Sequence, residues 1–220
     1  MGSIKRGLAN NIGASGVLGS SAFNNSSLDN ITSIGGAGSL TLLSSATASG
    51  DSYIDFTGID STYSEYWFVW NDYHPSTNGE STLGFQGSTD GGSSFGLTIT
   101  STMWTHYNNE ADNSYGLIYY NGGDLAQQTD TQILYDGGNG NDSDQNACGI
   151  LKLYNPSSTT YVKHFQSFGC NYQDSDYINL PYVSGYFNTT SAIDAIRFTP
   201  GRVYVSTTMD DGHFQMFGVK

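Results

Sequence analysis

From Leu40 onward, apolar and polar residues alternate with a period of two in short runs, and Gly, Asp, Asn and Pro separate the runs. This period places neighbouring side chains on opposite faces of a β-strand, and no run with the helical period exceeds about two turns. The pattern predicts about eleven strands, at residues 39–45, 52–59, 63–73, 81–88, 97–107, 114–120, 131–135, 147–154, 161–170, 177–187 and within 191–220. Their number and spacing predict an all-β fold, a jelly-roll-like antiparallel β-sandwich over residues 39–220.

The segment at 63–73 has the densest group of aromatic residues in the chain. Strict alternation places two sets of its side chains on opposite faces of the strand: Tyr66, Phe68 and Trp70 on one, and Trp67, Val69 and Tyr73 on the other. One of these faces is expected to point into the core of the sandwich.

Residues 191–220 predict a closing hairpin. Asp210-Asp211-Gly212 has the composition of a turn between two hairpin strands. The run from Phe214 to Val219 is then the terminal strand, which we expect to be held in a sheet and to close the fold.

Residues 1–38 differ from the rest of the chain in composition. They are rich in Gly, Ser, Asn and Ala, and they contain one aromatic residue, Phe23, and no acidic residue before Asp29. The segment is too apolar for a linker and too poor in large side chains for its own core, so we expect an extended N-terminal arm that docks on another subunit. The alternative is a disordered leader that ends near Gly35–Gly38. The residues expected to make the arm's contacts are Ile4, Lys5, Arg6, Leu8, Ile12, Val17, Leu18 and Phe23.

The charge of the chain excludes two classes of partner. Its 220 residues include 20 acidic and 7 basic side chains, which gives a net charge of −13 at pH 7. Nucleic acids and anionic membranes are bound by clustered basic residues, so we expect neither as a partner. No apolar run of a secretory signal peptide follows Lys5 and Arg6, and no run approaches the roughly 20 apolar residues that span a bilayer.

Five segments of the sandwich region form a recognisable set. They are IDFTGID (Ile54–Asp60), STDGGSSF (Ser88–Phe95), GILKLYNPSSTTYVK (Gly149–Lys163), AIDAIRF (Ala192–Phe198) and FQMFGVK (Phe214–Lys220). In this order they resemble segments of a group of virion structural proteins of tailed bacteriophages, in which a β-sandwich domain ends in a short strand of this kind.

The resemblance implies a structural component of a phage particle, foremost a tail fibre or tail-associated protein that contributes to attachment to the host. A capsid decoration protein is the alternative within the same group. The arm would bind other virion proteins, and the chain would be a homo-oligomer, with a trimer implied by fibre-like members of the group. Its location would be the virion, which is assembled in the host cytoplasm and released by lysis without a signal peptide.

No catalytic signature is visible in the chain. The four histidines, His74, His106, His164 and His213, are scattered and have no HExxH pattern. We therefore expect no enzymatic activity and name no catalytic residue. A glycan depolymerase is the enzymatic alternative, and it would need two carboxylates that the fold brings together in a cleft.

The longest polar loop, residues 136–146, is a candidate calcium site. Asp136, Asn139, Asp142 and Asp144 supply the hard oxygen atoms that Ca²⁺ prefers. The alternative is a solvated turn, because Asp and Asn are also favoured there. No other cofactor is expected.

The aromatic residues allow two interpretations. As exposed rings, Trp67, Trp104, Tyr107, Tyr119 and Tyr120 would form a platform on which sugars stack, and the protein would be a carbohydrate-binding adhesin for host-surface glycan. As buried rings, they would belong to the core or to a subunit interface, where aromatic residues are also frequent.

Two cysteines, Cys148 and Cys170, are too few for a metal site or a disulfide framework. We expect reduced, partly buried thiols. The two residues become neighbours only if their strands pair, which the sequence leaves open.

Overall fold

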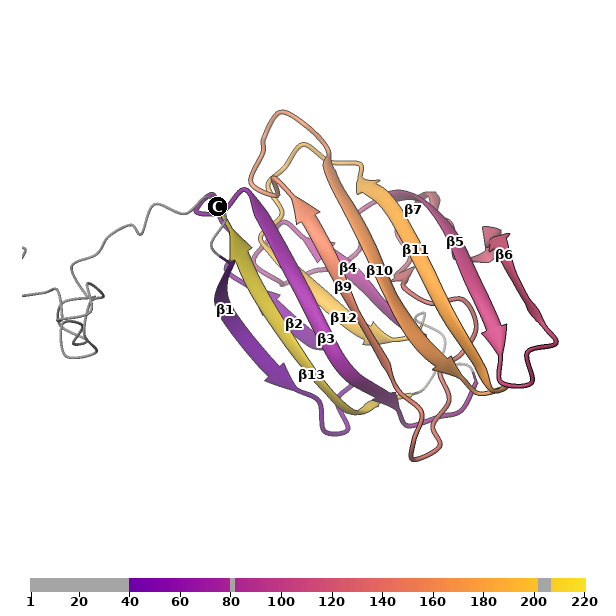
Figure 1. Ribbon diagram of the computed structural model, residues 1–220. Coiled ribbons are helices and arrows are strands. Elements are labelled where there is room, and N and C mark those ends of the chain that lie inside the picture. The colour runs from indigo at the N-terminus through magenta and orange to yellow at the C-terminus, as the bar shows by residue number, and fades with distance from the viewer. Residues whose placement is uncertain (1–39, 80–81, 202–206) are drawn as a thin grey trace, which may run out of the picture. The chain divides into compact units, whose positions relative to one another are not determined.

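The computed structural model describes residues 40–79, 82–201 and 207–220, which form thirteen strands in two antiparallel sheets and no α-helix (Figure 1). The strands of the large sheet, in spatial order, are β1 (Leu40–Thr47), β13 (Met209–Val219), β3 (Glu65–Pro75), β9 (Ala147–Tyr154), β10 (Lys163–Gln173), β11 (Tyr177–Phe187), β5 (Ile99–Asn109) and β6 (Tyr115–Tyr119), and β7 (Ala126–Gln128) also pairs with β5. The strands of the small sheet are β2 (Ile54–Thr57), β12 (Ala195–Pro200), β4 (Leu83–Ser88) and β8 (Gln132–Ile133). A short 3₁₀ turn, η2, spans Asn121–Gly123.

Eight of the described strands form a jelly roll. β1, β2, β3 and β4 pair antiparallel with β13, β12, β9 and β8 respectively. A chain folded back on itself as one long hairpin makes these four pairs, and rolling the hairpin distributes them between the sheets β1-β13-β3-β9 and β2-β12-β4-β8. The predicted jelly-roll-like antiparallel sandwich is therefore confirmed.

Two insertions lengthen the large sheet beyond β9. The strands β5, β6 and β7 lie in the chain between β4 and β8, and β10 and β11 lie between β9 and β12. They add to the sheet in the order β10-β11-β5-β6, on the right in Figure 1, and we call these four strands the extension. β7 was not predicted, because all three of its residues are exposed and show no alternation.

The core lies between the two sheets and is aromatic at its centre. The ring of Phe198, on β12, lies 6.3 Å from Phe56, 5.8 Å from Phe68, 5.9 Å from Trp70 and 5.6 Å from Phe214, measured between centroids. All five side chains are buried, and tilted or edge-on aromatic pairs at this spacing stabilise a core beyond the area they bury. The predicted inward face of residues 63–73 therefore lies in the centre of the sandwich.

One position in β3 differs from the prediction. Strict alternation places Tyr73 on the outer face with Trp67, but Tyr73 is fully buried. The pairing of β3 with β9 is irregular between Trp70 and Tyr73, and Asp72 has a φ of 55°. This bulge adds a residue to the strand and turns the Tyr73 side chain to the inner face.

The closing hairpin predicted for residues 191–220 is wrong, because β12 and β13 belong to different sheets and do not pair with each other. Asp210-Asp211-Gly212 lies inside β13 and not between two strands. The pairing of β13 with β3 shifts at these residues, and Gly212 has a φ of 141°, so the sequence makes a bulge where a reversal was expected. The terminal strand is held in a sheet as expected, and its place is between β1 and β3.

The eight residues expected to make the contacts of the arm, from Ile4 to Phe23, lie outside the described residues. Within the part of the chain that the structure describes, no helix has the length and apolar character needed to cross a membrane. The structure therefore bears on the sandwich alone.

Candidate functional site

The outer face of the extension carries exposed aromatic side chains. Along β5, Met103 is buried and the next residue, Trp104, is 40% exposed. Along β11, Val183 is buried while Tyr182 is 41% exposed, and Phe168 of β10 is 47% exposed. Alternation along each strand therefore places one set of residues in the interior and sends large apolar side chains into solvent.

Strand pairing brings three of these side chains into one row. Tyr182 lies opposite Trp104 on one side and opposite Phe168 on the other. The rings of Trp104 and Tyr182 are stacked, with centroids 4.2 Å apart and planes at 10°, and those of Tyr182 and Phe168 are 6.1 Å apart with planes at 23°. We call Phe168, Tyr182 and Trp104 the aromatic row; it crosses three strands and exposes nearly parallel rings.

Two of the residues predicted for a glycan platform extend the row at its ends. Tyr119 lies opposite Trp104 on β6 and is 63% exposed; its hydroxyl donates to the carboxylate of Asp124, which raises the pKa of Tyr119. At the other end, the Nζ of Lys152 lies 4.2 Å from the ring centroid of Trp67 and 6.0 Å from that of Phe168. Lys152 thus connects Trp67 to the row through cation–π contacts.

The other two predicted platform residues do not belong to the row. Tyr107 follows the buried Thr105 on the inward-facing positions of β5, where its ring lies 6.0 Å from that of Tyr177. Tyr120 packs against the buried core, and its backbone N–H donates to the carbonyl oxygen of Met103. Their positions on the strands therefore separate Tyr107 and Tyr120 from Trp67, Trp104 and Tyr119.

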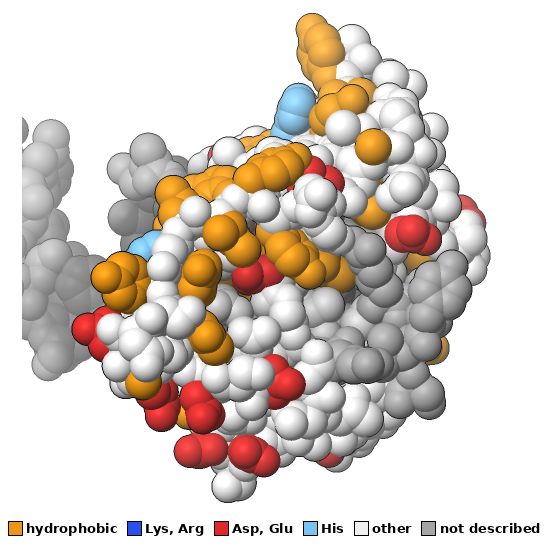
Figure 2. Space-filling view, turned by 90° about the vertical axis from the view of Figure 1, so that its right-hand side faces the viewer, with side chains coloured by type: hydrophobic (Ala, Val, Ile, Leu, Met, Phe, Trp, Pro, Cys, Tyr) orange, Lys and Arg blue, Asp and Glu red, His pale blue; other side chains and the backbone are white. Residues whose placement is uncertain are grey.

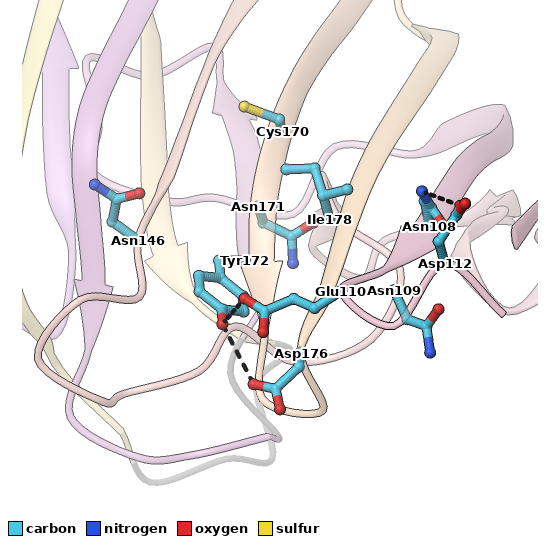
Figure 3. Close-up of a pocket in the computed structure, with 10 residues that line it drawn as sticks. All are labelled: Asn108, Asn109, Glu110, Asp112, Asn146, Cys170, Asn171, Tyr172, Asp176 and Ile178. Carbon is cyan, nitrogen blue, oxygen red and sulfur yellow. Dashed lines mark hydrogen bonds between the residues drawn. The ribbon is translucent and has the colours of Figure 1, made fainter. Parts of the chain in front are cut away.

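A hollow of about 520 Å³ lies beside the row, further along the same strands (Figure 3). Its residues are Asn108, Asn109, Glu110, Asp112, Asn146, Cys170, Asn171, Tyr172, Asp176 and Ile178. Cys170 stands two residues beyond Phe168 on β10, so the hollow begins about 7 Å from the row. We call it the acidic hollow, since three of its side chains are carboxylates and none is basic.

The tyrosine hydroxyl of the acidic hollow is held between two of these carboxylates. Tyr172 Oη lies 2.7 Å from Glu110 Oε1 and 3.3 Å from Asp176 Oδ1 (Figure 3). The hydrogen bond to Glu110 is the main reason why the pKa of Tyr172 is raised. Asn108 Nδ2 donates to Asp112 Oδ1 at 3.2 Å, so polar groups of β5 and β10 are fixed around the exposed side chain of Ile178.

A second hollow, of about 430 Å³, lies on the opposite side of the row. It includes Thr102, Gln166 and Ser184, which stand two residues before Trp104, two before Phe168 and two after Tyr182. The hydroxyl of Tyr154 donates to Gln166 Oε1 at 2.9 Å within it. An apolar row between two hollows rich in hydroxyl, amide and carboxylate groups has the composition of a ligand-binding face.

The structure does not bring the four predicted calcium ligands together. Asp136 and Asn139 are buried, whereas Asp142 and Asp144 are exposed. Burial raises the pKa of Asp136, and its Oδ1 has no hydrogen-bond partner. Within the described ranges, no three His, Cys, Asp or Glu side chains group as a metal site would require. Calcium binding by this loop stays a prediction.

The signal for the row was present only in part. Trp104 and Tyr119 were named as candidate platform residues, but Phe168 and Tyr182 were not. The alternation along β10 and β11 sends both outward; their position beside Trp104 depends on the pairing of β11 with β5, strands separated by six other elements in the chain.

Comparison with known proteins gives no relative: no family model, no curated protein and no solved structure matches the chain. The resemblance to virion proteins of tailed phages therefore stays a prediction from the sequence.

Proposed function

We propose that the protein is an attachment module of a tailed-phage particle, most consistent with a tail fibre or tail-associated protein, and that its sheet extension binds host-surface glycan without cleaving it. The place in the particle rests on the sequence resemblance. The glycan rests on one observation, the exposed and stacked row of Phe168, Tyr182 and Trp104.

The physical argument for a sugar starts from the cost of exposing these rings. Three large aromatic side chains that remain 40–47% exposed leave apolar surface in water, which a bound ligand would remove. The C–H groups on one face of a pyranose ring form a flat apolar surface that fits an aromatic ring, while its hydroxyl groups need hydrogen-bond partners at the edges. The two hollows supply such partners on both sides of the row.

Charge narrows the class of glycan. The acidic hollow contains Glu110, Asp112 and Asp176 and no basic side chain, within a chain of net charge −13. Like charges placed together oppose binding, so sialic and uronic acids are disfavoured there. The ligand class we propose is a neutral or amino-sugar oligosaccharide.

The test is binding of the full chain to an array of neutral, amino-sugar and acidic oligosaccharides, followed by calorimetry on the best ligand. Trp104→Ala and Tyr182→Ala should each weaken binding by about tenfold or more, because a stacked contact is lost. Tyr53→Ala is the matched control: Tyr53 is 51% exposed, directly precedes β2 and lies away from the row, so its replacement should leave affinity unchanged.

Two results would contradict the proposal. One is that no oligosaccharide binds the full chain; the other is that Trp104→Ala and Tyr53→Ala bind equally well. Release of shorter oligosaccharides during incubation would show that the protein cleaves the glycan, and the function would then be that of a depolymerase.

A second candidate function, assembly with other subunits, is favoured by the edge strand β6. Its residues Tyr115, Leu117, Ile118 and Tyr119 are 67%, 65%, 42% and 63% exposed, and Figure 2, which faces the β6 side, shows hydrophobic side chains gathered there. An apolar edge strand pairs readily with another chain. If β6 is a trimer contact, Leu117→Lys should convert a trimer to a monomer in light scattering and leave glycan affinity per chain unchanged; a monomeric wild type would exclude this role.

A further inference from the structure

The two cysteines lie side by side on paired strands. Cys148 of β9 is the register partner of Cys170 of β10. Their Sγ atoms are 3.3 Å apart, both side chains are half-buried, and both thiols are free. The residues are 22 positions apart in the chain, so a bond between them would close a loop through the β9–β10 connection.

The backbone at this pair already has the dimensions of a disulfide. Residues directly opposite each other in an antiparallel pair have Cα atoms about 4.5 or 5.5 Å apart, and disulfides accept Cα separations of about 4.4–6.8 Å. The sulfur atoms need to approach by little more than 1 Å, to about 2.05 Å. The neighbouring register pair is Gly149 and Gly169, which has no side chains to hold the strands apart.

We propose that Cys148 and Cys170 form a thiol–disulfide exchange site, at which a small-molecule disulfide converts the two thiols into a cross-strand disulfide. One cysteine loses its proton and its sulfur attacks the small disulfide, which releases one small thiol and leaves a mixed disulfide. The second cysteine then loses its proton and attacks the protein sulfur of the mixed disulfide, which releases the second small thiol. In total, two protein thiols and one small disulfide give one protein disulfide and two small thiols.

The bond would join two parts of the fold. β9 is the last jelly-roll strand of the large sheet, and β10 is the first strand of the extension. Cys170 also lines the acidic hollow, where Figure 3 shows it above Asn171 and Ile178. Oxidation therefore fixes the strand that carries Phe168 and Tyr172 to the jelly roll.

Burial controls how fast this exchange runs. Desolvation, with a smaller contribution from Cys148, raises the pKa of Cys170 to about 11. The thiolate is the reacting form. Below that pKa, the rate of a step that uses Cys170 as the nucleophile therefore rises about tenfold for each unit by which the pH is increased. We expect reduced protein to persist near pH 7 and to oxidise more quickly at pH 9.

The test uses the full chain, reduced with dithiothreitol, freed of reductant and incubated with glutathione disulfide at pH 7 and pH 9. Intact mass spectrometry should show a loss of about 2 Da, from two hydrogen atoms, and peptide mapping should link Cys148 to Cys170. The oxidised form should melt about 5–10 °C higher than the reduced form, and dithiothreitol should reverse the shift.

Cys148→Ser and Cys170→Ser are the matched controls. Each has one thiol, so each should stop at a glutathione adduct and show no reversible rise in melting temperature of this kind. The proposal is overturned if the wild-type chain stays fully reduced at both pH values, or if it ends as a glutathione adduct as the single variants do. These mass readouts on the wild type decide the matter even if a serine variant fails to fold.

Discussion

The indole N–H of Trp70 donates a 2.6 Å hydrogen bond to the hydroxyl oxygen of Tyr135 inside the core. The same hydroxyl donates to the backbone carbonyl oxygen of Cys148 at 3.1 Å. Tyr135 therefore connects β3 and β9 of the large sheet with the segment that follows β8, through one buried oxygen atom. Buried polar groups of this kind are stabilising only while every partner is present.

Removal of that oxygen atom gives the first prediction. Tyr135→Phe keeps the ring and leaves the Trp70 N–H buried without an acceptor, which should lower the free energy of unfolding by about 1–3 kcal/mol. Urea denaturation measures it. Tyr154→Phe is the control, because Tyr154 bonds Gln166 at the surface and its change should stay within about 0.5 kcal/mol. Equal effects of the two substitutions would contradict the role of Tyr135.

The pair Arg197–Asp55 gives a second prediction. Arg197 donates from Nε and Nη2 to the two carboxylate oxygens of Asp55, both at 2.7 Å, and its guanidinium lies 3.9 Å from the ring centroid of Tyr53 and 4.1 Å from that of Phe95. Lysine cannot reproduce the two parallel bonds, so Arg197→Lys should cost about 1 kcal/mol in thermal or urea unfolding.

The salt dependence of the Arg197→Lys stability cost distinguishes this pair from an exposed surface ion pair. Part of the Arg197→Lys cost should remain at 1 M NaCl, because the contact of the guanidinium with the rings of Tyr53 and Phe95 is not screened as an exposed ion pair is. A variant as stable as wild type at low salt would show that the two bonds contribute nothing.

Asp136 gives a prediction about pH. Burial raises its pKa in the folded protein above the ordinary value of 3.8. The folded state therefore holds the proton more tightly than the unfolded state, so this group contributes stability below about pH 3.8, and the contribution is lost as pH rises through the raised pKa. The Oδ1 atom of this buried carboxyl group has no hydrogen-bond partner.

Asp136→Asn removes the titration and should raise the free energy of unfolding at pH 7 by about 1 kcal/mol. The gain over wild type should shrink as the pH approaches 4, which unfolding curves at several pH values would show. A loss of stability at pH 7, together with a rise of the wild-type melting temperature on addition of Ca²⁺, would instead support the predicted calcium site.

Gly185 gives a prediction about the extension. A Cβ atom at this position of β11 would lie 2.6 Å from Phe165 Cζ and 2.6 Å from the carbonyl oxygen of Thr100. Because one of these atoms is backbone, Gly185→Ala should lower the free energy of unfolding by about 1–3 kcal/mol and weaken the pairing of β11 with β5. Ser184→Ala, on the outer face of the same strand, is the control and should change it by less than about 0.5 kcal/mol; amide hydrogen exchange would locate the effect.

The fold could be predicted from local patterns where each strand keeps a strict alternation. Tyr66, Phe68 and Trp70 were placed on one face by period alone, and all three are buried. Tyr73 could not be placed, because one extra residue at Asp72 reverses every later position in the strand. A bulge also lies at Asp210-Asp211-Gly212, whose composition predicted a turn.

The candidate site depended on relationships that no local pattern contains. Trp104 and Tyr182 stack because β11 adds to β10 and β5 adds to β11, an order fixed by two separate insertions. The proximity of Cys148 and Cys170 has the same origin, since it requires the register of β9 with β10. The sequence shows which residues are aromatic or carry a thiol, but it does not show which strands pair and so which of these side chains become neighbours.

The two insertions have a consequence for how such a protein can change. Each leaves the jelly roll after one of its strands and returns before the next, so the eight paired strands keep their order whatever the inserted strands contain. Substitutions on the outer face of β5, β10 and β11 can then alter what is recognised while the scaffold folds as before. The extension is thus a replaceable part, and exchange of its outward side chains is a direct route to engineering a new specificity.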